Sequence, residues 1–157
     1  MKRFLLSFVY AGRGLWYCAR HERNFRIHLT AALYVLAFAP SFSLSRGEWS
    51  ALLVMIALVA AAEGINTAIE RAVDLNGKNP HPLARIAKDT AAGAVLFCAL
   101  AAVGVAGILF WRPEELAALA GRLLQTPWKL AALALSVPLS LWFIFRGGVQ
   151  SKNSLRK

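Results

Sequence analysis

Long apolar runs separated by short polar segments dominate the chain, a pattern typical of helices that cross a membrane. The predicted spans cover about residues 27–44, 49–74, 88–111 and 130–145. The first has a short apolar core, so we expect it to tilt or to borrow length from the interface. Residues 2–26 mix basic with aromatic and aliphatic side chains, which predicts an amphipathic helix at the membrane surface. The predicted fold class is all-α, a polytopic membrane helical bundle with an amino-terminal surface helix.

Turn and helix-start signals predict the segments that connect these spans. Residues 76–82 contain two asparagines, a glycine and two prolines, which indicates a loop. Pro113, followed by two glutamates, favours a short surface helix before the fourth span. Residues 146–157 are basic and polar, and we expect this tail to be disordered. Small residues recur every four positions between Ala94 and Ala106, a ridge suited to close helix packing that the fourth span is a candidate to cover.

The composition supports a membrane protein and helps to decide which binding partners to expect. Of the 157 residues, 58% are hydrophobic, more than a soluble domain of this size usually carries. The net charge of +10 would also suit nucleic acid, but no basic array interleaved with aromatic residues follows the amino terminus. We therefore attribute the charge to an anionic lipid surface and expect no nucleic-acid partner. Cys18 and Cys98 are too few and too scattered for a zinc site or a disulfide framework.

The distribution of lysine and arginine predicts the orientation. Fourteen of these residues fall on the side of the two termini, and four fall in the loops on the other side. Because cytoplasmic segments carry the excess of positive charge, we expect both termini to be cytoplasmic.

A stripe of acidic and amide side chains follows the apolar run 51–62 of the second span. It consists of Glu63, Asn66, Glu70 and Asp74. At about 100° per residue, these positions lie within roughly 80° of one another on one helix face. Ionisable residues at a membrane helix end are costly, and stacked carboxylates repel one another unless a cation lies among them. The pattern favours a functional site over the alternative, a polar helix end that has emerged into water.

Two further segments add charged groups on the same side of the membrane. Glu22 supplies another carboxylate, and two or three carboxylates with room for water suit Mg²⁺, which keeps several waters and binds substrate phosphates. Lys88 and Asp89 open the third span with a phosphate-binding cation and another acceptor. Their alternative role is that of snorkelling and helix-start charges. For Glu22 the alternative is an ion pair with Arg26, one turn away.

No glycine-rich phosphate loop is present, so a nucleotide site would have to be built from helices and their ends. The three histidines, His21, His28 and His81, lack the spacing of metal ligands. We interpret them as interfacial or loop residues.

Three motifs resemble the small prokaryotic diacylglycerol kinase and undecaprenol kinase family, over about residues 3–111. They are Glu22-x-x-Phe25-Arg26, then Glu63-x-x-Asn66-Thr67-Ala68-Ile69-Glu70-x-x-x-Asp74, and Ala87-Lys88-Asp89-x-x-Ala92-x-Ala94-Val95. Segments 7–14 and 24–28 look more like the undecaprenol kinase branch. The resemblance implies a lipid kinase that phosphorylates diacylglycerol or undecaprenol with ATP and Mg²⁺. It also implies a homotrimer with shared active sites in the bacterial cytoplasmic (inner) membrane.

The resemblance also assigns roles and boundaries. By motif position, Glu63 matches the general base that takes the lipid hydroxyl proton, and Glu22 and Glu70 match the carboxylates that hold Mg²⁺ on ATP. The nucleotide-site positions fall on Arg3, Tyr10, Asn66, Asp74, His81, Lys88 and Asp89. Short family members lack a fourth span, so we divide the chain into a lipid kinase domain, residues 1–111, and an extension, residues 112–157.

The position of Glu63 fits this role independently of the resemblance, because it is the carboxylate deepest toward the apolar run and a lipid hydroxyl meets it first. The rival function is a small cation or proton translocator, since carboxylates in the membrane also mark ion pathways. Such a pathway needs polar groups through the membrane depth. Segments 27–39, 94–110 and 130–145 contain no acidic residue, so we expect an enzyme.

Overall fold

The computed structural model describes residues 2–75 and 81–146, and this part of the chain contains helices and no strand, which confirms the all-α class. The elements are α1 (Lys2–His21), α2 (Arg23–Phe38), the 3₁₀ turn η1 (Ala39–Ser41), α3 (Arg46–Asp74), α4 (Pro82–Phe110), α5 (Pro113–Leu124) and α6 (Pro127–Phe145). Most of the predicted loop 76–82 and the predicted disordered tail beyond residue 146 lie outside the described residues.

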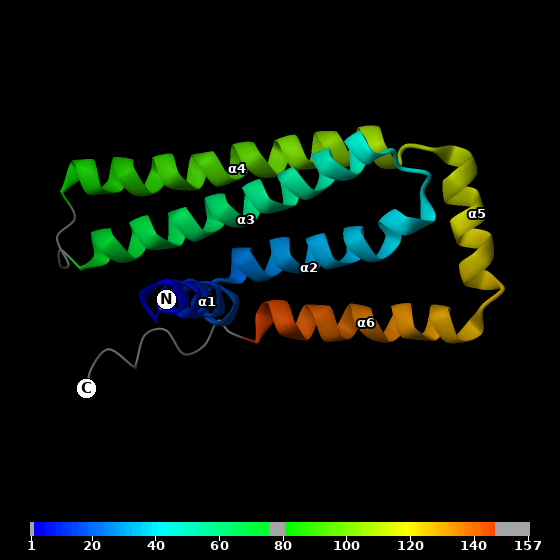
Figure 1. Ribbon diagram of the computed structural model, residues 1–157, viewed down its shortest axis with the longest axis horizontal. Helices are drawn as coiled ribbons and strands as arrows, with labels where there is room; N and C mark the ends of the chain where they lie inside the picture. Colours follow the sequence, from blue (N-terminus) through cyan, green and yellow to red (C-terminus); the bar gives the residue numbers. More distant parts are fainter. Residues whose placement is uncertain (1, 76–80, 147–157) are drawn as a thin grey trace.

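Four helices lie side by side in the order α4, α3, α2 and α6, with their axes roughly along one direction (Figure 1). Helix α1 is seen end-on where one set of ends of these four helices lies, and α5 crosses the bundle at their opposite ends (Figure 1). We call these the α1 end and the α5 end. Helices that lie across the two ends of a bundle are placed as surface helices would be, in agreement with the predicted roles of α1 and α5.

Three helices, α3, α4 and α6, are long and apolar enough to cross a membrane. They correspond to the predicted spans 49–74, 88–111 and 130–145, and each begins a few residues earlier than predicted. The start of α3 has a clear cause, because Ser45 and Glu48 form a capping box that satisfies two free backbone N–H groups. Helix α2 has 16 residues, fewer than a span usually needs, so the first predicted span stays a prediction.

The boundary between the surface helix and the next helix differs from the sequence prediction. The predicted surface helix extended to residue 26, but α1 ends at His21 and Glu22 has extended backbone angles (φ −102°, ψ 115°) as the N-cap of α2. Phe25 and Arg26 are buried as part of α2. The break arises because these two side chains pack inward, where an unbroken surface helix would leave them at the interface.

Arg26 ties together the carboxyl-terminal ends of two other helices. Its side chain is only 2% exposed. Nε donates a hydrogen bond to the Ile144 carbonyl at the end of α6 (3.1 Å), and Nη1 donates one to the Arg20 carbonyl at the end of α1 (2.9 Å). Helix carboxyl ends carry partial negative charge, so a buried guanidinium is stabilised between them.

Helix α6 packs on α2, not on the small-residue ridge of α4 that the sequence suggested. The hydroxyl of Tyr34 on α2 shares hydrogen bonds with Ser136 (2.8 Å) and Ser140 (3.0 Å) on α6. Hydrogen bonds between hydroxyl groups can hold two membrane helices together without a small-residue ridge, which explains why α6 packs on α2 and not on α4. From that ridge, Ala102 and Ala106 line a cavity between α2, α3 and α4.

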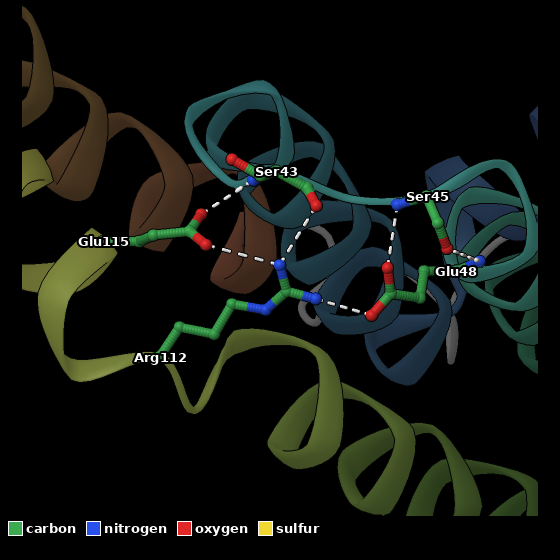
Figure 2. Close-up of polar contacts among 5 residues, drawn as sticks. All are labelled: Ser43, Ser45, Glu48, Arg112 and Glu115. Atoms are coloured by element: carbon green, nitrogen blue, oxygen red, sulfur yellow. Dashed lines mark hydrogen bonds and ion pairs between the residues drawn. The ribbon is translucent and has the colours of Figure 1, made fainter.

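At the α5 end, Arg112 is the centre of a hydrogen-bonded cluster with Ser43, Ser45, Glu48 and Glu115, which we call the Arg112 network (Figure 2). Arg112 donates to the Ser43 carbonyl (3.1 Å) and to both glutamates. Burial acts to lower the pKa of Arg112, but the hydrogen bonds and charges of the two glutamates outweigh it and raise that pKa above its usual value. The ion pairs and hydrogen bonds of this network therefore connect the start of α5 to the segment between α2 and α3 and to the first turn of α3.

Candidate active site

The acidic stripe lies at the α1 end, on the last three turns of α3 (Figure 1). Burial decreases along it: Glu63 is 2% exposed, Asn66 and Glu70 are half-buried, and Asp74 is exposed. This gradient matches the predicted order from an apolar end toward a polar end.

Glu63 is a buried carboxylate with an incomplete set of partners. Nε2 of His28, on α2, lies 3.3 Å from Oε1 of Glu63. The orientation of the two groups is not that of a hydrogen bond, and Oε1 has no hydrogen-bond partner among the described residues. The charges of Glu22 and Glu70 also act on Glu63, so three carboxylates share one region. Since burying an unpartnered polar group is costly, this arrangement is suited to a group that arrives from outside the chain.

Glu22 pairs with α3 rather than with its own helix. Its Oε1 lies 2.5 Å from Nη2 of Arg71, while Arg26 is directed to the two helix ends described above. The alternative reading of Glu22 as a partner of Arg26 is therefore wrong. The Arg71 guanidinium also lies over the ring of Tyr17 on α1, 5.6 Å from its centre, so one side chain connects α1, the N-cap of α2 and α3.

Asn66 and Glu70 form a hydrogen-bonded pair on successive turns of α3. Nδ2 of Asn66 donates to Glu70 (3.0 Å), and Oδ1 of Asn66 is buried with no hydrogen-bond partner in the described part of the chain. Within residues 2–75 and 81–146, no three His, Cys, Asp or Glu side chains gather as a complete metal site. Glu22, Glu70 and the amide oxygen of Asn66 are nevertheless oxygen donors in the same region of the structure. Such a set fits Mg²⁺, which keeps waters and shares its coordination with phosphate oxygens.

The other predicted nucleotide residues are spread around the same end. Lys88 on α4 lies 3.0 Å from Asp74, which joins α4 to the stripe. Asp89 is exposed and faces Arg85 (3.8 Å). His81 is the N-cap of α4, where its Nδ1 accepts a hydrogen bond from the backbone of Leu83 (3.2 Å).

The surface helix α1 carries the last two predicted positions. Tyr10 is exposed and has Arg13 over its ring, 5.8 Å from the centre. Arg3 lies in the first turn of α1. The structure thus gathers Glu22, Glu63, Asn66 and Glu70 in one region, joins Asp74 to Lys88, and gives Tyr10, His81 and Asp89 other neighbours.

Sequence reasoning missed two residues of this region, His28 and Arg71. His28 was interpreted as interfacial, but it contacts the buried Glu63. Its signal was a histidine inside the apolar run 27–39. Arg71 is next to Glu70 and about 100° away from it around the helix, so the stripe pattern excluded it.

An apolar cavity of about 230 Å³ runs between α2, α3 and α4. His28 and Phe25 line it toward the α1 end, and Leu52 and Val105 line it toward the α5 end. His28 therefore both lines the cavity and contacts Glu63. The cavity has the chemistry of a site for a hydrocarbon chain.

The fold and the site define a helical membrane protein with a buried carboxylate at the edge of its apolar zone. Residues 9–110 match the family model of prokaryotic diacylglycerol kinase. The chain therefore belongs to the prokaryotic diacylglycerol kinase family and is a lipid kinase, which sets aside the translocator as a reading of the stripe. Helices α5 and α6 follow the matched residues.

Curated relatives agree with this assignment. The undecaprenol kinase of Bacillus subtilis is 45% identical over 115 residues, which cover 73% of this chain and 92% of the relative. The diacylglycerol kinase of Synechocystis is 44% identical over 110 residues, which cover 69% of this chain and 63% of the relative. A diacylglycerol kinase of Helicobacter pylori is 34% identical over 110 residues, 70% of this chain and 79% of the relative.

Proposed function

We propose that the protein transfers the γ-phosphoryl group of ATP to the hydroxyl of a membrane lipid alcohol at the α1 end, on the cytoplasmic face of the bacterial inner membrane. The observation that carries this proposal is the buried Glu63, whose Oε1 finds no hydrogen-bond partner among the residues the structure describes and whose neighbour His28 lines the apolar cavity. A lipid chain in that cavity would bring its hydroxyl to the carboxylate.

In this proposal Glu63 is the general base. It takes the proton of the lipid hydroxyl as that oxygen bonds to the γ-phosphorus and the bond from phosphorus to the bridging oxygen of ADP breaks. A base in this position must lie within hydrogen-bond reach of the hydroxyl, and a buried carboxylate excludes water as a competing acceptor. Phosphoryl transfer otherwise depends on positioning and on neutralising charge.

Glu22 and Glu70 are the proposed ligands of Mg²⁺, which would neutralise charge on the phosphates. Support comes from their oxygen donors, from their common influence on Glu63, and from the adjacent unpartnered Oδ1 of Asn66. Arg71 holds Glu22 in place from the neighbouring helix.

The remaining nucleotide contacts are proposed on the exposed side of this region. Lys88, tied to Asp74, is a cation at the polar end of the stripe and suits a phosphate. Arg3, Tyr10, His81 and Asp89 are proposed to contact the nucleotide from α1 and from the start of α4. We further propose a homotrimer with shared sites, which size analysis in detergent tests.

For the acceptor we propose undecaprenol, with diacylglycerol as the alternative. Support comes from the Bacillus subtilis undecaprenol kinase, 92% of whose length this chain covers. The test is phosphorylation of each lipid by the purified protein in detergent with radiolabelled ATP. We expect Mg²⁺-dependent labelling, faster with undecaprenol. Preference for diacylglycerol would reverse the assignment, and labelling of neither lipid would contradict the proposed function.

A further inference from the structure

His28 of α2 makes a direct side-chain contact with the proposed base, Glu63. Glu63 is 2% exposed, and the side chain of His28 is 28% exposed. His28 is thus the more accessible member of the pair, and it stands where the apolar cavity meets the carboxylate. A carboxylate on a flexible side chain needs a fixed partner if one of its oxygens is to face a substrate.

We infer that His28 is a positioning residue for Glu63: its imidazole, with the proton on Nε2, donates to one lone pair of Oε1 and fixes the carboxylate so that the same oxygen can also accept from the lipid hydroxyl. This inference rests on the proposed function, in which Glu63 is the base. At 3.3 Å the two atoms lie within hydrogen-bond reach, and only their orientation departs from that of a hydrogen bond. Catalytic hydrogen bonds are often long before the substrate binds, so the distance agrees with this role.

The other charged neighbours of Glu63 do not serve this purpose. Glu22 and Glu70 are carboxylates, which repel Glu63 and accept hydrogen bonds without donating them. Arg71 is engaged with Glu22 and with the ring of Tyr17. Among the described residues that act on Glu63, His28 supplies the N–H donor.

Two substitutions at His28 distinguish the contribution of its N–H donor from that of its aromatic ring. His28→Phe keeps an aromatic ring and removes the donor, whereas His28→Gln keeps a side-chain N–H at a similar reach. We expect kcat to fall about 10- to 100-fold in His28→Phe, because a small misplacement of the base is costly. KM for ATP should stay unchanged, and His28→Gln should recover most of kcat. Tyr34→Phe is the matched control, because it removes hydrogen bonds from the same helix on the side facing α6.

A second measurement does not depend on activity. With ¹⁵N-labelled histidine in the full-length protein, the Nε2 signal of His28 should shift when Glu63→Gln is introduced, and shift much less with Glu48→Gln. A wild-type kcat in His28→Phe, an equal loss in His28→Phe and His28→Gln, or an unshifted Nε2 signal would overturn the inference. Absence of lipid phosphorylation by the unmodified protein would instead refute the proposed function, while the Nε2 signal still reports the contact.

Discussion

The two ends of the bundle each hold a polar cluster, and the clusters differ in how completely they are satisfied. In the Arg112 network, both oxygens of Glu48 and of Glu115 accept hydrogen bonds, and Ser43 takes part through its backbone N–H and carbonyl (Figure 2). At the α1 end, four buried side-chain atoms lack a hydrogen bond. They are Nη2 of Arg26, Oε1 of Glu63, Oδ1 of Asn66 and Nε of Arg71. In the described residues, all such atoms lie at this one end.

The two clusters therefore differ in whether the chain alone completes their hydrogen bonds. Buried polar groups in folded proteins nearly always have partners, because an unpaired one loses its hydration without compensation. A network that is complete within one chain needs nothing more to be stable. A cluster that leaves both acceptors and donors unpaired is suited to be completed by a ligand or by another subunit.

The largest expected effect comes from Glu63→Gln. The substitution keeps the shape of the side chain and removes the base, so we expect lipid phosphorylation to fall by about 10²–10⁴-fold with nucleotide binding largely retained. Steady-state phosphorylation and binding of a fluorescent ATP analogue measure the two properties. Glu48→Gln is the matched control, since it makes the same change at the α5 end of the same helix. Turnover of Glu63→Gln within about tenfold of the unmodified protein would remove it from the base role.

A smaller effect is expected from Glu70→Gln and Glu22→Gln. Each removes one hard oxygen ligand, so the Mg²⁺ concentration for half-maximal rate should rise by about tenfold or more. Titration of the rate with Mg²⁺ at fixed ATP measures this shift. The Glu22 variant also weakens the contact with Arg71, so Arg71→Met serves as its control. Unchanged titrations in both glutamate variants would place the metal elsewhere.

These two clusters also mark how far the sequence alone can predict the molecule. The helical class and the face of the stripe follow from periodicity, because one helix determines which of its own residues share a side. The graded burial from Glu63 to Asp74 follows from the direction of the apolar run. The contacts of His28, Arg26 and Arg71 depend on which helices are neighbours, and no pattern within one helix contains that information.

Helix boundaries and neighbours were the weaker predictions for the same reason. The break at Glu22 depends on the burial of Phe25 and Arg26 against other helices. The packing of α6 on α2 depends on hydroxyl groups that meet across more than one hundred positions of sequence. Both arise from tertiary contacts that a single sequence does not display.

A third prediction concerns the extension. Truncation before Pro113 removes the Ile144 carbonyl that accepts from Arg26 and the two serines that bond Tyr34. We expect lower thermal stability in detergent with measurable kinase activity, because the predicted catalytic residues all precede residue 111. Unfolding temperature, size analysis and lipid phosphorylation of the truncated protein are the measurements. Tyr34→Phe in the full chain is the control for the hydroxyl contacts alone. A well-folded truncated protein without activity would show that α6 belongs to the active site.

The smallest effect on activity is expected at the α5 end, from Arg112→Met. The substitution keeps the length of the side chain but leaves Glu48, Glu115 and the Ser43 carbonyl without their shared donor. Because the Arg112 network is complete and distant from the stripe, we expect a lower unfolding temperature with kcat and KM within about twofold of the unmodified protein. Adding Glu48→Gln should cost less in the Arg112→Met background than alone, since contacting residues are not additive. A loss of activity at an unchanged unfolding temperature would instead mean that the two ends of the bundle are coupled. In that case, a complete set of hydrogen bonds would not show that a polar cluster has only a structural role.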